Sequence, residues 1–473
     1  MKIALVNTNL MRPPIAPVGL EYLAEAMIAR GHEVSLVDLC LAEEPEACLA
    51  TQLAAIRPEL VGITVRNTDD CYFTGQDFFL PRIKRFVEIT RETVAAPIVL
   101  GGVGYSVAPG PILDYLGADL GIAGEGEAAL DLLAAAVDHG GGFEQVPGLV
   151  HRSDGQLVAN SQKHIDLAAL PPRQRTLADN RRYFAEGGQA GFETKRGCGM
   201  ACIYCADPVA KGRTWRLLPP EMVVREIRAL LDQGIDHLHT CDSEFNLPAD
   251  HGAAVCEEII RSGLGQSVHW YAYCSPSPFT PEMAELFVRA GCAGVDFGVD
   301  SGDEGILAGL ARHFHPAEIR QTAKICRRFG IHYMFDLLIG GPGETRESVR
   351  RTIGLMKEID AERVGVAIGV RVYPGTRMAR IAREQPEALH GSADPELLRP
   401  VFYLAPELGP DAVGFVRELV GDDPRFFLPV ADDPDKNYNY NDNSVLVEAI
   451  GSGYRGAYWD ILRRLASEHE QDC

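Results

Sequence analysis

Short continuous apolar runs alternate with helical patterns over the first 140 residues of the chain. The strand candidates are KIALVN (2–7), the strand inside RGHEVSLVDL (30–39), ELVGITVRN (59–67), APIVLGG (96–102) and DLGIAG (119–124). Continuous apolar strands separated by helices are typical of a parallel sheet that is covered on both faces. Five such units predict a doubly wound, flavodoxin-like domain over residues 1–140, with its ligand site at the carboxyl ends of the strands.

Small and polar residues collect at those predicted carboxyl ends. They are Asn7, Arg66, Asn67, Gly101, Gly102, Val103, Gly104, Gly124 and Glu125. Glycine lets a ligand approach the backbone closely, but ordinary turns between strands and helices also use glycine. The pattern alone therefore supports a ligand site and plain turns equally.

A second alternating pattern begins at residue 189, after a connector at 141–188 that is rich in Gly, Pro and polar residues. Its strand candidates are AGFETKRG (190–197), HLHTCDSEF (237–245), HWYAYCS (269–275), AGVDFGVDS (293–301), HYMFDLLIGG (332–341) and RVGVAIGVRVYPG (363–375). Six consecutive βα units predict a partial (β/α)6 barrel over residues 189–386, with its chemistry at the carboxyl ends of the strands. Residues 387–473 have a mixed pattern, and their YNYNDN stretch fits a substrate lid and an ordinary loop equally. The predicted fold class is thus α/β.

Composition and charge narrow the functional class. The 473 residues are 46% hydrophobic and 23% charged, which is a globular mixture. The 66 acidic and 45 basic residues give a net charge of −21, which repels phosphate backbones, so we expect no nucleic-acid partner. No apolar run approaches the roughly 20 residues that span a bilayer, and the first residues lack a signal-peptide cleavage site, so we expect no membrane partner. Twelve cysteines are too few for a disulfide scaffold. We therefore expect a cytoplasmic protein, in which a tight cysteine cluster means metal or redox chemistry.

The most informative stretch follows the first predicted barrel strand, where Cys198, Cys202 and Cys205 lie within eight residues. Thiolates prefer zinc or iron–sulfur clusters. A structural zinc site needs a fourth Cys or His at similar spacing, and none follows Cys205 closely. Three ligands leave one iron of a four-iron cluster open to bind a substrate. The pattern favours a cluster over zinc, and both over three core cysteines that are neighbours by chance.

This CxxxCxxC spacing, with an aromatic residue before the last cysteine, resembles the radical S-adenosylmethionine (SAM) superfamily. Further segments match the pattern of that family in chain order, namely DSEFN (242–246), GVDSG (298–302), GGPGE (340–344) and YPGT (373–376). The N-terminal domain, with GGVGYS and GEGE, is similar to the cobalamin-binding domain of cobalamin-dependent radical SAM enzymes. Together the two resemblances cover roughly 70% of the chain.

The resemblance implies a set of cofactor-binding residues. Cys198, Cys202 and Cys205 would hold a [4Fe–4S] cluster whose open iron binds SAM. The other implied roles go to Tyr204 beside the adenine, Asp242 and Glu244 on the SAM amino group or a substrate, Asp300 and Ser301 on the ribose, and Gly340, Gly341 and Gly343 along the adenine or methionine moiety. From the residues alone, the alternative for Tyr204 is a core aromatic and the alternative for the two acids is a pair of solvated caps, and the functional interpretation is favoured for all three.

The resemblance also implies an activity. In such enzymes cobalamin usually carries a methyl group from SAM to a substrate radical, so we expect a methyltransferase acting on a carbon, or a phosphorus, of a small molecule or peptide. A flavodoxin or ferredoxin would supply electrons. Relatives that methylthiolate transfer RNA carry three further ligating cysteines, whereas Cys40, Cys48 and Cys71 are too scattered here. Ring contraction or ring closure without methyl transfer stays open, and so does a cobalamin-sensing protein with an inert barrel.

One departure from the cobalamin pattern concerns the lower face of cobalt. Many cobalamin domains supply an axial imidazole from Asp-x-His-x-x-Gly, but His32 is the only histidine before residue 130 and it has the wrong neighbours. The third strand instead ends at Arg66, which has no free nitrogen lone pair and cannot ligate cobalt. We therefore predict an unligated lower face beside Arg66. The alternative is that Arg66 pairs with Asp69 or Asp70 at the surface.

Overall fold

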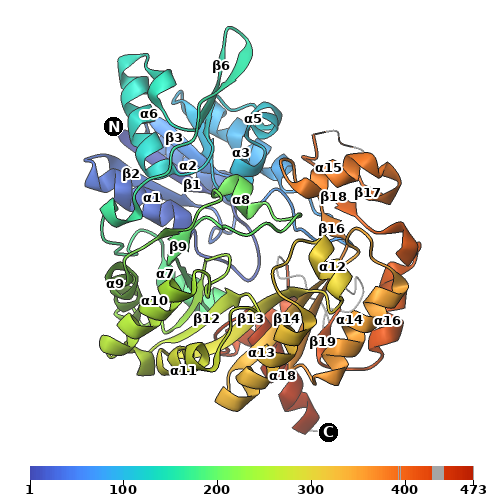
Figure 1. The fold of residues 1–473 in the computed structure, drawn as a ribbon. Helices are drawn as coiled ribbons and strands as arrows, with labels where there is room; N and C mark the ends of the chain where they lie inside the picture. The colour runs from blue at the N-terminus through green and yellow to red at the C-terminus, as the bar shows by residue number, and fades with distance from the viewer. Residues whose placement is uncertain (393, 395, 429–441, 472–473) are drawn as a thin grey trace.

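The computed structural model describes residues 1–392, 394, 396–428 and 442–471, which form an α/β structure with two parallel sheets (Figure 1). The N-terminal sheet has the strand order β2-β1-β3-β4-β5-β6-β7, and its first five strands are parallel. These strands are β1 (Lys2–Asn7), β2 (Glu33–Asp38), β3 (Leu60–Thr64), β4 (Ile98–Gly101) and β5 (Leu120–Ile122). The order 2-1-3-4-5 is the flavodoxin-like one that the alternating pattern predicted.

Helices cover both faces of this sheet and bury its apolar side chains. One core includes residues of α1 (Val18–Ala29) and α6 (Gly126–His139), and the other includes residues of α2 (Pro45–Ile56), α3 (Leu80–Thr93) and α5 (Pro109–Leu116). Both faces of each strand are therefore apolar, which explains the continuous apolar runs in the sequence.

The sheet does not end at residue 140, as the predicted boundary had it. Two further strands, β6 (Leu149–Ser153) and β7 (Gln156–Ala159), form an antiparallel hairpin that extends the sheet beyond β5. The turn falls at Asp154 and Gly155, which both have positive φ, and such residues favour tight hairpin turns. Residues 141–188 resembled a connector because they are rich in polar residues. Part of this composition belongs to β7, in which every residue is exposed to solvent.

The second sheet is a partial barrel whose strands follow chain order, β8-β11-β12-β13-β14-β15, with a short seventh strand at its edge. The strands are β8 (Ala190–Phe192), β11 (His237–Thr240), β12 (His269–Cys274), β13 (Cys292–Asp300), β14 (His332–Ile339), β15 (Arg363–Ile368) and β19 (Phe426–Phe427). The covering helices are α9 (Pro220–Leu231), α10 (Ala249–Arg261), α11 (Pro281–Arg289), α12 (Glu304–Gly309), α13 (Pro316–Phe329) and α14 (Arg346–Glu358). Alternate residues of β12 and β13, including Trp270, Ala272, Val295 and Phe297, are fully buried beneath these helices. The residues between them face the barrel interior.

The described part of the C-terminal segment packs against the barrel on the side of its inner face that lies away from the cysteine loop. After α15 (Arg377–Glu384), α16 (Ala412–Val420) and a small sheet of β16 (Val370–Arg371), β17 (Leu389–Gly391) and β18 (Val401–Tyr403), the chain ends in α17 (Ser444–Gly451) and α18 (Tyr458–Gln471). Trp459 of α18 packs with Tyr271 of β12 and Met334 of β14, which both face the barrel interior. Most of the YNYNDN stretch lies outside the described residues. Across the described ranges no helix is long and apolar enough to span a membrane.

A buried ionic network joins the two domains through the connector. Arg175 of the connector donates hydrogen bonds to Glu21 of α1 at 2.8 Å and to Glu226 of α9 at 2.9 Å. Arg173 donates to Glu226 at 3.1 Å, and Asn180 donates to Glu21 at 2.9 Å. The side chains of Glu21, Arg175 and Glu226 have no exposed surface. These residues form what we call the seam, and they fix the carboxyl edge of the N-terminal sheet toward the barrel.

Candidate functional site

A cavity of about 910 Å³ lies between the carboxyl ends of the N-terminal strands and the inner face of the barrel. Its walls come from both domains and from the C-terminal helix α18. This volume is near the upper end of the range for small-molecule and cofactor sites. The predicted ligand sites of the N-terminal sheet and of the barrel, which are far apart in the sequence, thus open onto one cavity.

The N-terminal wall holds most of the residues predicted at the strand ends. Asn7, Arg66, Asn67, Gly101, Gly102, Val103, Gly124 and Glu125 all line the cavity. A Cβ at Gly101 would meet no atom within 4 Å, and the apolar side chain of Val103 beside it is 44% exposed. An open backbone next to an exposed apolar side chain fits the flat, largely apolar edge of a corrin ring.

Two of the predicted cofactor residues serve the fold of this wall. A Cβ at Gly104 would lie 2.9 Å from the carbonyl oxygen of Arg66, so glycine here permits α4 (Val103–Val107) to pack on the end of β3. Glu125 is paired with Arg196 at 3.4 Å and with Arg216 at a shorter distance, and both arginines belong to the barrel domain. Glu125 therefore bridges the two domains across the cavity wall.

The three cysteines sit in a loop that flanks the cavity. This loop follows β9 (Lys195–Arg196), and α8 (Asp207–Ala210), which follows Cys205, brings Ala210 and Lys211 to the cavity wall. Gly197 has φ +83°, and a Cβ there would lie 2.2 Å from the carbonyl oxygen of Thr214, so the loop requires glycine at its start.

The three cysteine thiols are neighbours in this loop. Burial raises the pKa of all three, that of Cys205 to about 12, and the neighbouring thiols raise the pKa of Cys198 and of Cys205 further. Arg312 places Nη1 3.0 Å from Sγ of Cys202, which supplies positive charge beside a thiolate ligand. Within the described residues no three His, Cys, Asp or Glu side chains are grouped as a single metal ion requires. Three neighbouring cysteines, with no fourth Cys or His following closely in the sequence, fit an iron–sulfur cluster better than a structural zinc site.

Arg312 organises the acidic and aromatic side chains beside the cysteines. Its Nε lies 3.3 Å from Asp300 and its Nη2 3.4 Å from Glu244. The Tyr204 hydroxyl donates to Asp300 at 2.7 Å. Asp300 ends β13 with φ +61°, an uncommon conformation for a residue other than glycine. Tyr204, Asp300 and Glu244, predicted separately from three motifs, thus surround one guanidinium.

The predicted pair of acids after β11 divides into two environments. Asp242 accepts hydrogen bonds from Thr194 and from the ammonium of Lys195 at 3.2 Å, so its oxygens are occupied. Glu244 leaves Oε2 buried and without a hydrogen-bond partner in the described part of the chain. Burial raises the pKa of Glu244 to about 7, against the lowering influence of Arg312. Neither carboxylate is a solvated cap, and only Glu244 has an oxygen available to a ligand.

The remaining predicted SAM residues have local structural contacts. The Ser301 hydroxyl accepts from the Asp303 backbone at 3.1 Å and lies 3.0 Å from the Thr352 hydroxyl. The backbone N–H groups of Gly340 and Gly341 donate to Glu344, which closes the turn on itself. The positive φ at Gly340 and Gly343 explains those glycines without a ligand.

Arg66 points into the cavity from the end of β3. Its Nη1 lies 3.0 Å from Sδ of Met11, and it forms no ion pair with any described residue. Asp69, one of the two partners that the alternative named, is instead held by Arg371 of the barrel domain at 2.7 Å, and Arg66 forms no ion pair with the other, Asp70. His32 lies just before β2, at the opposite end of the sheet, where its Nε2 contacts Asp131 at 2.9 Å.

Sequence reasoning missed Arg312, Asp296 and Asp336. Asp296 and Asp336 line the cavity from β13 and β14. Asp296 could have been found from strand alternation. In AGVDFGVDS, residues 296, 298 and 300 lie on one face, so Asp296 shares the face of the predicted site residue Asp300. Arg312 lies in a loop after α12 and belongs to none of the motifs found in the sequence.

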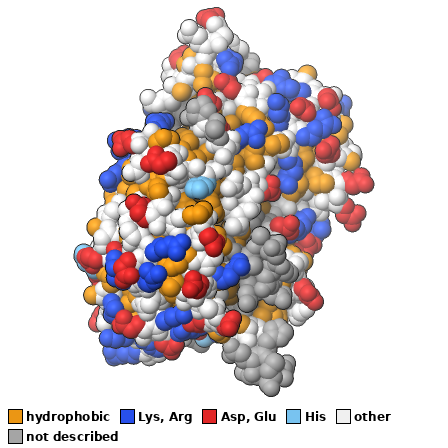
Figure 2. Space-filling view, turned by 90° about the vertical axis from the view of Figure 1, so that its right-hand side faces the viewer, with side chains coloured by type: hydrophobic (Ala, Val, Ile, Leu, Met, Phe, Trp, Pro, Cys, Tyr) orange, Lys and Arg blue, Asp and Glu red, His pale blue; other side chains and the backbone are white. Residues whose placement is uncertain are grey.

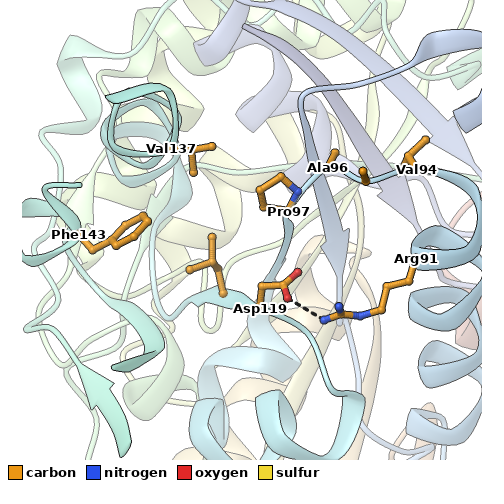
Figure 3. Close-up of a pocket in the computed structure, with 9 residues that line it drawn as sticks. Arg91, Val94, Ala96, Pro97, Asp119, Val137 and Phe143 are labelled. Carbon is orange, nitrogen blue, oxygen red and sulfur yellow. Dashed lines mark hydrogen bonds and ion pairs between the residues drawn. The ribbon is translucent and has the colours of Figure 1, made fainter. Parts of the chain in front are cut away.

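A second hollow, of about 560 Å³, lies at the opposite end of the N-terminal sheet (Figure 3). Its lining is mostly apolar, with Val94, Val137 and Phe143 around the Arg91–Asp119 ion pair of 2.8 Å. It is far from the carboxyl ends that carry the site. On the molecular face shown in Figure 2, Lys and Arg side chains are interspersed with Asp and Glu.

The comparisons with known proteins agree with this architecture. Residues 7–134 match the family model of the B12 binding domain, and residues 192–356 match that of the radical SAM superfamily. The chain is 31% identical to the tryptophan 2-C-methyltransferase of Streptomyces laurentii, over 97% of this chain and 95% of that relative.

Two solved structures of the radical SAM methyltransferase TsrM from Kitasatospora setae have the same fold. The structure with tryptophan substrate and the SAM analogue aza-SAM bound has a TM-score of 0.93 at 31% identity, covering 99% of this chain and 98% of that chain. The structure with cobalamin and a [4Fe–4S] cluster bound has a TM-score of 0.89 at 30% identity, with 98% of each chain covered.

The chain belongs to the cobalamin-dependent radical SAM methyltransferases. Its cofactors are a [4Fe–4S] cluster, SAM and cobalamin, and the predictions of family, fold class, enzyme class and cofactors are confirmed. The roles of individual site residues stay predictions.

Proposed function

We propose that this enzyme methylates a carbon atom of tryptophan or of a closely related indole amino acid. The observation that carries the proposal is the end-to-end similarity to the tryptophan 2-C-methyltransferase, which includes the C-terminal segment. That segment places Tyr458 and Trp459 in the cavity wall.

The cavity offers flat aromatic surfaces to an indole ring. Tyr273 of β12 is 43% exposed, and its ring centroid lies 4.8 Å from that of His239 on the neighbouring strand. Trp459 lies against the backbone of Gly294, where a Cβ would approach its ring to 2.9 Å. Offset and edge-to-face contacts with such rings favour an aromatic acceptor.

The three cofactors supply the difficult chemistry, since cobalamin carries the methyl group that SAM provides and the cluster handles electrons. Cys198, Cys202 and Cys205 would hold the cluster, and Arg312 would balance their charge. The strand ends around Gly101 and Arg66 would hold cobalamin. We assign cobalamin binding to residues 1–140 with the β6–β7 hairpin, and cluster and SAM binding to residues 189–386. A flavodoxin or ferredoxin would donate the electrons.

Product analysis tests the proposed substrate. The reconstituted enzyme would be incubated anaerobically with reductant, cobalamin, tryptophan and SAM labelled in its methyl group. We expect labelled methyltryptophan by mass spectrometry, with one label per molecule on the indole. Demethylation of SAM without a labelled indole product, together with label in another compound of a cell extract, would contradict the proposal.

A further inference from the structure

A polar row crosses the inner face of the barrel beneath the predicted cofactor level. Tyr273 of β12 pairs in register with Asp296 of β13, and Asp336 lies one inward position further along β14. All three side chains line the cavity. Below this row, Tyr271 and Met334 are covered by α18, so the row forms the floor of the open space.

The two carboxyl groups of this row are neighbours, with Asp296 buried and Asp336 half-buried. Asp296 is 3% exposed, and its Oδ1 has no hydrogen-bond partner among the residues the structure describes. A hydrogen bond links Asp296 to Asp336. Burial raises the pKa of Asp296 well above its usual range, and the neighbouring Asp336 and Glu244 raise it further. No described cation forms an ion pair with Asp296.

Asp336 has glycines as its register partners on both sides, Gly298 on β13 and Gly365 on β15. The side-chain atoms nearest to the inner side of Gly298 are Nη2 of Arg312 and Oε1 of Glu244, so only the side toward Gly365 has no neighbouring side chain in that row. A small group entering from the cavity therefore has access to both carboxyls. A buried carboxyl that served only the core would be fully hydrogen-bonded or replaced by an apolar residue, because an unsatisfied buried carboxylate oxygen is costly, yet Oδ1 of Asp296 has no partner among the described residues.

We propose that Asp296 and Asp336 together bind an ammonium group of the methyl acceptor. The identity of that acceptor as an indole amino acid rests on the proposed function, whereas the need for a cation rests on the carboxyl pair itself. An ammonium group has three donors, enough to contact Oδ1 of Asp296 and the carboxyl of Asp336 together. Its charge allows both acids to ionise. The pair thereby selects a free amino acid or amine over an acceptor whose nitrogen is acylated or missing.

Binding to the cofactor-loaded enzyme tests this pair without relying on turnover. Titration calorimetry would compare tryptophan, tryptamine, which lacks the carboxylate, and indole-3-propionate, which lacks the ammonium. We expect tryptophan and tryptamine to bind, and indole-3-propionate to bind roughly 30-fold more weakly or worse. Phenylalanine and 3-phenylpropionate extend the comparison beyond indoles.

Substitutions locate the effect. Asp296→Asn and, separately, Asp336→Asn should each weaken tryptophan and tryptamine by roughly 30-fold while leaving indole-3-propionate unchanged. Asp119→Asn, in the remote hollow, is the matched control and should change none of the three. Iron content and the visible spectrum of bound cobalamin verify that each variant is intact.

The outcomes separate the two proposals. Ammonium-dependent binding that is lost in both variants, without methylation of any indole, supports the carboxyl pair and overturns the indole substrate. Equal binding of indole-3-propionate and tryptophan overturns the carboxyl pair, even when tryptophan is methylated. Failure of every amine to bind the intact wild-type enzyme overturns both.

Discussion

The seam between the domains and the mouth of the barrel both bury charged side chains, but they satisfy them differently. At the seam, both carboxylate oxygens of Glu21 and of Glu226 accept hydrogen bonds, and Arg175 connects the two acids. We use "mouth" for Glu244, Asp296 and Glu344, each of which has one buried oxygen without a hydrogen-bond partner among the described residues.

This difference separates assembly from ligand binding. A buried charge is tolerated when arginine and backbone donors surround it, as at the seam. A buried carboxyl with a vacant oxygen becomes protonated instead, and burial raises the pKa of Glu244 and of Glu344 to about 7 each. Complete pairing of the seam carboxylates thus joins the two domains, whereas each carboxyl of the mouth keeps one oxygen without a partner among the described residues.

The largest expected effect is the loss of the cluster. Replacing Cys198, Cys202 and Cys205 together by alanine should reduce the iron of anaerobically reconstituted protein from about four atoms per chain to near zero. The seam lies outside the cysteine loop, so circular dichroism should show a folded protein. Elemental analysis measures the metal. Wild-type protein with tightly held zinc and no iron would contradict the assignment of the thiols.

The next effect is on the seam itself. Arg175→Met keeps much of the apolar stem but leaves Glu21 and Glu226 buried without their shared cation. Removing one partner from a buried ion pair typically lowers the free energy of unfolding by about 3–5 kcal/mol. Urea unfolding, followed by tryptophan fluorescence, measures the loss.

Arg182→Met is the matched control, because Arg182 pairs with Glu186 on the surface, where the side chains are 47% and 43% exposed. The loss there should stay under about 1 kcal/mol. Equal effects of the two substitutions would erase the distinction between the seam and an ordinary surface pair.

At the mouth, removing a buried charge should raise the free energy of unfolding, whereas at the seam it lowers it. The pKa of Glu344 is raised to about 7 from an ordinary 4.5, so the folded state binds its proton more tightly than the unfolded state. Stability should therefore fall as pH rises from about 4.5 to 7, by up to about 3 kcal/mol from this group.

Glu344→Gln removes that titration. The variant should equal the wild type near pH 4, below the pKa of the unfolded state, and be the more stable protein at pH 8, by urea unfolding of the cofactor-free chains. Glu347→Gln, on the exposed face of the following helix, should show no such divergence. A difference that does not change with pH would mean that Glu344 is ionised in the fold.

Much of this architecture could be predicted from the sequence, because strand period and apolar runs are local signals. The cysteine spacing was likewise readable, since all three cysteines lie in one loop. The seam could not be predicted, because Glu21, Arg175 and Glu226 are far apart in sequence and ordinary in composition. The β6–β7 hairpin was missed because an exposed edge strand such as QLVA shows no apolar run. Arg312 was missed because its partners come from three different strand ends.

The smallest expected effect concerns Arg66. Like Arg175 of the seam it is an arginine with buried surface, and like Asp296 of the mouth it has no ion pair among the described residues. It lines the cavity from the end of β3, where we propose that cobalamin binds. Burial lowers its pKa from the ordinary value, but an arginine remains protonated and offers no lone pair to a metal. Electron paramagnetic resonance of the bound cobalt(II) form should show no superhyperfine splitting from an axial nitrogen. Arg66→Lys should shift the cobalt signal slightly, because a compact ammonium replaces a planar guanidinium, while Arg85→Lys on the outer face of α3 should not shift it. Axial nitrogen splitting in the wild type would place an imidazole or the cofactor's own base where we place Arg66. Arg66 would then have a structural role only, as the seam residues have.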